Sequence, residues 1–88
     1  MTPEGFDAAR VTLAAETLVA KRRKGVGRAW PRIADALGDA FSVQFGVFAS
    51  QFPPHPAGPF HDGLAFARQL DRRGELPPAA VPEYVNAR

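Results

Sequence analysis

Four phenylalanines at intervals of three or four residues limit most strongly the folds open to this 88-residue chain. They are Phe41, Phe45, Phe48 and Phe52. At 100° per residue they lie within about 60° of one another on a helix, while Val43 and Val47 lie on the opposite side. No Asp, Glu, Lys or Arg occurs in residues 40–61. A helix that is apolar on both faces is usually central in a helical domain, so we expect this helix to pack in the core. The alternative is a groove for a peptide or partner helix.

The N-terminal part of the chain predicts a long amphipathic helix. Residues 8–23 contain no glycine or proline, and their apolar residues keep to one side of the helix. Asp7 suits the N-cap position, because its carboxylate can accept from free amide groups of the first turn. Gly25 and Gly27 would each cost about 1 kcal/mol inside a helix, so the sequence leaves open whether the helix continues through them.

Two further helices follow from the next glycines and prolines. Pro31 suits the first turn of a short second helix, where its missing N–H costs nothing, and Gly38 predicts the end of that helix. Asp39 then predicts an N-cap for a third helix over residues 40–52, the phenylalanine-rich one.

A proline-rich loop is expected before the last main helix. Pro53 and Pro54 end the third helix, and residues 55–61 contain two more prolines and a glycine. Asp62 predicts the N-cap of a fourth helix, which runs to residue 73 with Gly74 as its stop.

These segments predict an all-α fold, a small bundle of about four helices in one domain over residues 1–88. Residues 1–5 and 83–88 are predicted to be loose tails. No segment alternates apolar and polar residues well enough to be a strand. No run of about 18 apolar residues is present, and the N-terminus lacks a basic region followed by an apolar run, so we expect a cytoplasmic protein with no membrane contact.

The strongest polar signal is a basic stretch between Lys21 and Arg32. Residues 17–34 contain six basic residues and no acidic one. Such a stretch could neutralise phosphates, but four consecutive helical residues point 100° apart and surround the helix instead of lining one face. Arg22 falls among the apolar residues, so it reaches solvent along its stem, pairs with a carboxylate, or marks where the helix leaves the core.

Three interpretations of this stretch stay open: a solvated face, a surface for a protein or peptide, and a weak nucleic-acid site. The candidate partner-binding residues are Lys21, Arg23, Lys24 and Arg28. A formal net charge of only +2 does not favour nucleic acid.

The sequence offers little for catalysis. Without cysteine there is no disulfide, iron–sulfur cluster or thiolate zinc site. His55 and His61 lie in a loop whose spacing does not gather the three ligands of a catalytic metal. Ser42 and Ser50 have no base at a suggestive spacing, and the glycines at 25 and 27 lack the Lys-Ser/Thr of a phosphate-binding loop. We therefore expect no enzyme, no cofactor and no metal.

Several short motifs together resemble a family of small uncharacterised actinobacterial proteins. The likeness covers most of the chain and rests on Gly5-Phe6-Asp7, Lys21-Arg22, Arg28-Ala29-Trp30-Pro31, Ala36-Leu37-Gly38, Asp62-Gly63, Phe66-Ala67-Arg68 and Arg73-Gly74-Glu75-Leu76-Pro77. This resemblance implies no particular chemistry.

A more distant resemblance covers residues 31–84. It rests on the order of Pro31, Leu37-Gly38, Phe41, Pro53-Pro54, Phe66, Leu70, Leu76-Pro77 and Glu83. These residues are similar to the companion proteins labelled "putative DNA-binding domain" that accompany multi-iron, peptide-modifying oxidases, as in methanobactin assembly. The resemblance implies a non-enzymatic accessory module that binds a protein or peptide partner. The alternative is a weak nucleic-acid-binding domain that uses the Lys21 to Arg32 stretch.

Overall fold

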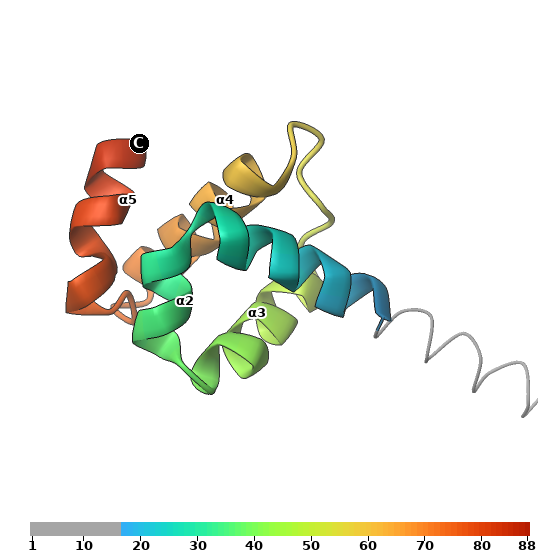
Figure 1. Cartoon of the computed structure of the whole chain (residues 1–88), viewed down its shortest axis with the longest axis horizontal. Helices are drawn as coiled ribbons and strands as arrows, with labels where there is room; N and C mark the ends of the chain where they lie inside the picture. The colour runs from blue at the N-terminus through green and yellow to red at the C-terminus, as the bar shows by residue number, and fades with distance from the viewer. Residues whose placement is uncertain (1–16) are drawn as a thin grey trace, which may run out of the picture.

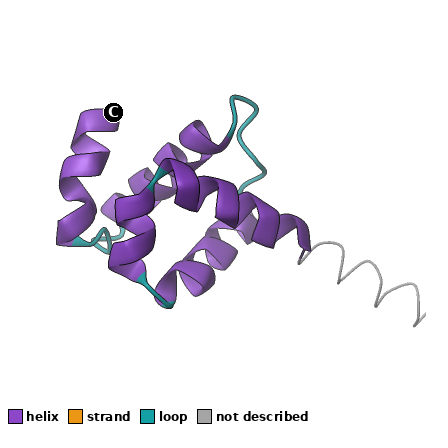
Figure 2. Ribbon diagram, in the orientation of Figure 1, coloured by secondary structure: helices purple, strands orange, loops and turns teal. Residues whose placement is uncertain are grey.

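The computed structural model describes residues 17–88, and this part of the chain is helical with short connections (Figures 1 and 2). The described part of the first helix covers residues 17–29. It is followed by α2 (Pro31–Leu37), α3 (Ala40–Gln51), α4 (Pro59–Arg72), the 3₁₀ turn η1 (Pro78–Ala80) and α5 (Val81–Ala87). The all-α prediction is confirmed for these residues, among which there is no strand. The predicted Asp7 cap and the predicted tail over residues 1–5 lie outside them.

The first helix continues through Gly25 and Gly27 and ends at Ala29, two residues before Pro31. Trp30 stands between this helix and α2 with φ −130° and ψ 65°, outside the helical region. A residue that precedes proline is pushed out of the α conformation, and proline itself has no N–H to continue the hydrogen-bond ladder. The chain therefore turns here, and Pro31 opens α2 as predicted.

Helix α3 has one buried face and one exposed face. Phe45 and Phe48 are buried, whereas Val43 is 70% exposed and Val47 is partly exposed. The core prediction for the phenylalanines is therefore confirmed for these two, but α3 is not buried all round. Asp39 occupies the N-cap position without a capping hydrogen bond from its side chain.

The proline-rich loop lies where it was expected, but α4 begins earlier than Asp62. Pro59 is its first residue and Gly58 its N-cap, with φ 106°, a conformation that residues with a Cβ rarely adopt. Asp62 lies inside the first turn and is 3% exposed, so its prediction as the cap is wrong. Pro59 lies in the helix and not in the loop, in agreement with the preference of proline for a first helical turn.

The prediction that residues 83–88 form a loose tail is also wrong. They belong largely to α5, which packs Tyr84 into the core. The Glu83 carboxylate accepts hydrogen bonds from the backbone N–H groups of Arg32 at 3.2 Å and Ile33 at 3.0 Å. These amides belong to the first turn of α2 and have no partner within their own helix. Glu83 therefore caps α2 from a distance of 50 residues in sequence.

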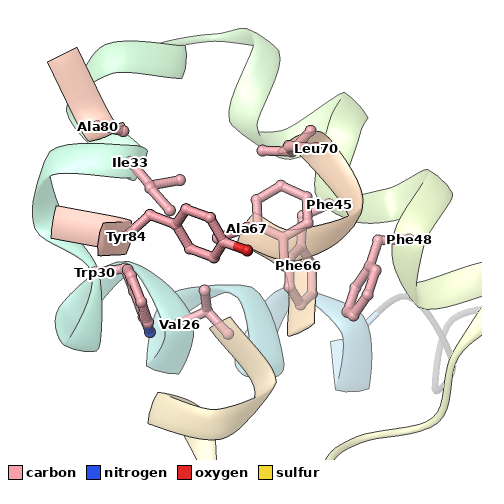
Figure 3. Packing of buried hydrophobic residues seen from close by; sticks show 10 residues of the cluster. All are labelled: Val26, Trp30, Ile33, Phe45, Phe48, Phe66, Ala67, Leu70, Ala80 and Tyr84. Carbon is pink, nitrogen blue, oxygen red and sulfur yellow. The ribbon is translucent and has the colours of Figure 1, made fainter. Parts of the chain in front are cut away.

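The core lies where the helices meet, and Tyr84 projects into the middle of it (Figure 3). Its buried members are Val26, Trp30, Ile33, Phe45, Phe48, Phe66, Ala67, Leu70, Ala80 and Tyr84. Trp30, which directly follows the first helix, lies against α4 at Gly63, where a Cβ atom would fall on the Trp30 ring. The Trp30 indole N–H donates to the Phe60 carbonyl at 2.9 Å, so the one polar group of this buried ring has a hydrogen-bond partner. This packing fixes the side of the first helix that faces inward.

None of the helices in residues 17–88 combines the length and apolar character needed to cross a bilayer.

Candidate functional site

Within the basic stretch, Arg22 turns inward and pairs with Asp62 of α4. Its Nε donates to Oδ2 at 2.6 Å, and its Nη2 donates to Oδ1 at 2.7 Å. The two side chains are only 11% and 5% exposed. The planar guanidinium thus meets both carboxylate oxygens in the two-pronged arrangement that is strongest for arginine. Of the three options that the sequence left for Arg22, the structure shows the carboxylate pair.

The same guanidinium also reaches the end of α3. Nη1 donates to the Phe52 carbonyl at 2.8 Å, and Nη2 donates to the Pro53 carbonyl at 3.1 Å. The guanidinium carbon lies 5.3 Å from the ring centroids of both Phe45 and Phe48, within range of a cation–π contact. Arg22 therefore ties together the first helix, α3 and α4. Its charge is therefore paired within the fold.

Three other cations lie on the outward face of the first helix. Lys21, Lys24 and Arg28 are all exposed. At 100° per residue they lie within about 60° of one another, and they extend over about 10 Å of helix axis. None of them forms an ion pair with a carboxylate in residues 17–88. We call these three residues the basic face.

A hollow of about 390 Å³ adjoins the basic face, between the first helix and the proline-rich loop. Its lining residues are Leu18, Lys21, Arg22, Gly25, Arg28, Pro54, His55, Gly58, Pro59 and Asp62. We call it the helix–loop hollow. The Arg22–Asp62 pair forms one part of its wall, and Lys21 and Arg28 form another. The first helix therefore presents cations and apolar groups to the same space.

The structure brings together three of the four predicted partner-binding residues. Lys21 and Arg28 line the helix–loop hollow, and Lys24 lies beside them on the basic face. Arg23 is half-buried and is turned about 100° or more away from each of the three, so it does not belong to this face. The spacing of residues 21, 24 and 28 already carried this information. It was missed because the four consecutive basic residues were considered as one group.

Other polar groups in the described residues form no reactive arrangement. The rings of His55 and His61 stack with centroids 5.3 Å apart, and His55 Nδ1 accepts from the Ala57 N–H at 3.0 Å. The Ser50 hydroxyl donates to the Val47 carbonyl one turn earlier. Among residues 17–88, no three His, Asp or Glu residues gather closely enough to hold a metal ion.

A second hollow of about 390 Å³ lies between the end of the first helix and α5. Trp30 and Phe60 stack there with ring centroids 5.3 Å apart, and Arg32 and Asn86 contribute polar groups. Glu83 also lines it, but its carboxylate already accepts the two α2 amide hydrogens. This hollow follows from how α5 docks, and no unpaired cation cluster adjoins it in the described residues.

A comparison with known families identifies the family of this chain. A family model described as "SCO6045-like, C-terminal domain" matches residues 1–72, so the chain belongs to that family. The matched segment includes the basic face and both partners of the Arg22–Asp62 pair, and it stops before η1 and α5. No curated protein and no solved structure matches the chain.

Proposed function

We propose that this chain is a non-enzymatic accessory module that binds an acidic protein or peptide partner through its basic face. The observation that carries this proposal is the set of three exposed cations on one face of the first helix, without a carboxylate partner in the described residues. Another cation of the same stretch, Arg22, pairs with Asp62 and donates to the carbonyl that ends α3.

Unpaired like charges within about 10 Å repel one another and add nothing to folding stability. A row of carboxylates removes that repulsion, and the attraction mainly raises the association rate and sets the register of binding. Because such a contact orders few residues, we expect a dissociation constant in the micromolar range, which corresponds to a binding free energy of about −8 kcal/mol.

The resemblance to companions of multi-iron, peptide-modifying oxidases supports a more specific proposal for the partner. The partner is then such an oxidase or its precursor peptide, in an actinobacterial cytoplasm. Gene neighbours test this step directly. An iron-oxidase gene and a short precursor-peptide gene beside this one support it, whereas a regulator gene with operator-like repeats supports the nucleic-acid alternative.

Charge reversal on the basic face tests the binding proposal. The probe is a fluorescein-labelled peptide rich in Glu and Asp, followed by fluorescence anisotropy. The variant K21E/K24E should lose at least tenfold in affinity. The control R68E/R72E removes two exposed cations from α4 with the same change in net charge, and it should bind as the wild type does. Equal losses in both variants, or no binding to the wild type, would contradict the proposal.

A labelled DNA duplex separates the nucleic-acid alternative. Three phosphate contacts predict a slope of about −3 for log K against log salt concentration, with binding lost near 150 mM salt. Duplex binding that survives at 150 mM salt and is tighter than peptide binding would make nucleic acid the better proposal.

A further inference from the structure

The helix–loop hollow has an inner wall whose polar groups already have partners. Both Asp62 carboxylate oxygens accept from Arg22, and two further Arg22 N–H groups donate to the Phe52 and Pro53 carbonyls, so four of its five donors have a partner. No buried side-chain nitrogen or oxygen in the described residues lacks a hydrogen-bond partner. A ligand group that enters the hollow therefore gains little from hydrogen bonds at this wall.

The rest of the hollow offers apolar contact. Pro54 and Pro59 are exposed. Leu18, a large aliphatic side chain, is 67% exposed. A smaller adjacent hollow shares Leu18, Arg22 and Pro54 and continues the apolar surface toward Ala49 of α3. Burial of these carbons by a ligand is favourable in proportion to the area removed from water.

The two cations lie on the same side of the hollow. Lys21 and Arg28 are two turns apart on the first helix, and Gly25 stands between them without a side chain. The missing side chain lets the Pro59 ring pack against the helix here, about 3.3 Å from where a Cβ atom would lie. A ligand that lies along the first helix therefore meets a cation on each side of this Gly25–Pro59 contact. This arrangement suits a segment with carboxylates on both sides of one apolar side chain.

The opposite wall is built to hold its shape. Pro53, Pro54, Pro56 and Pro59 restrict the backbone of the loop. His55 fixes the turn, because its Nδ1 accepts from the Ala57 N–H and its carbonyl accepts from the Gly58 N–H at 3.1 Å. A wall that is already ordered loses little conformational entropy when a ligand binds. At about 390 Å³ the hollow is at the small end of ligand sites, which suits one side chain and its flanking backbone.

We infer that the helix–loop hollow receives one apolar side chain of an acidic peptide segment, whose flanking carboxylates pair with Lys21 and Arg28. This inference rests on the proposed function and adds the sequence character of the partner: Asp or Glu on both sides of a Leu-like residue. The cations attract the segment, and the hollow selects which residue of the segment docks.

Three labelled peptides of eleven residues test the inference. The first has Leu at its centre with Glu and Asp on both sides, the second has Gly in place of Leu, and the third keeps Leu but has Gln and Asn in place of the acids. We expect the Gly peptide to bind the wild-type protein about tenfold more weakly than the Leu peptide, and the uncharged peptide to bind more weakly still.

The variant L18S should reduce the tenfold preference for Leu to less than threefold. The matched control V43S changes a side chain that is equally exposed on α3, and it should keep the full preference. Leu and Gly peptides that bind the wild type equally, yet both weaken in K21E/K24E, would overturn this inference and leave the proposed function intact. Acidic peptides that fail to bind at all would overturn both.

Discussion

Two parts of one basic run differ in burial and in the groups that they contact. Arg22 is largely buried against Asp62 and two phenylalanine rings, whereas Lys21 and Lys24, its close neighbours in sequence, are exposed. The difference comes from the 100° rotation per helical residue, which separates a continuous run of charge into an inward and an outward set. A run of charge on a helix is therefore interpreted by its faces and not by its length.

The sharpest way to break this comparison is to remove the inward cation. Arg22→Ala leaves the Asp62 carboxylate buried without a partner, which costs about 3–5 kcal/mol in the free energy of unfolding. Lys21→Ala, on the outward face, should change it by less than about 0.5 kcal/mol. Urea denaturation followed by circular dichroism measures both.

A double variant separates loss of charge balance from loss of packing. R22M/D62L removes both charges and fills the space with apolar atoms, so it should recover most of the stability lost in Arg22→Ala. An Arg22→Ala protein that unfolds at the same urea concentration as the wild type would show that the pair is not structural.

Helix α3 provides the same contrast with apolar residues. Phe45→Ala should cost a comparable amount, about 3–5 kcal/mol, because Phe45 is fully buried and contacts Phe66 with ring centroids 5.2 Å apart. Val43→Ala, at a 70% exposed position, should cost less than about 0.5 kcal/mol. Thermal melts that show equal losses would mean that the two faces of α3 are equally buried.

Much of the fold follows from the sequence, because helical period and proline positions are local signals. The period of the phenylalanines predicted α3, and α2 begins at Pro31 and ends before Gly38 as expected. The pairing of Arg22 with Asp62 could not be predicted, since the two residues are 40 positions apart. Asp62 was predicted to be an N-cap because a carboxylate near the start of a helix suits both an N-cap and an ion pair, and only the three-dimensional structure distinguishes the two.

Of the candidate site, the cations could be predicted from the sequence, but the hollow beside them could not. Lys21, Arg23, Lys24 and Arg28 were predicted from the basic run, and the face shared by three of them, without Arg23, needed only their spacing. The helix–loop hollow could not be foreseen, because it depends on how the proline-rich loop folds back toward the first helix. Helix α5 was missed because its docking needs amides of α2 that are distant in sequence.

Removal of the distant cap should have a smaller effect than the core changes. Glu83→Ala deprives two α2 amides of their acceptor, and helix caps of this kind contribute about 1 kcal/mol. For a domain of this size we expect the melting temperature to fall by about 4–8 °C. Glu75→Ala removes an exposed carboxylate whose one ion pair within residues 17–88 is with Arg73, and it should leave the melting temperature nearly unchanged.

Hydrogen exchange at the arginine Nε–H groups, observed by nuclear magnetic resonance in the unmodified protein, tests the division of the basic run most directly. The Arg22 Nε–H is held by Asp62, so its exchange should be at least tenfold slower than that of the exposed Arg28. Raising the salt concentration should leave this protection in place, because a buried pair is weakly screened. Equal and fast exchange at both arginines would contradict the account, since Arg22 would then be one more solvated cation.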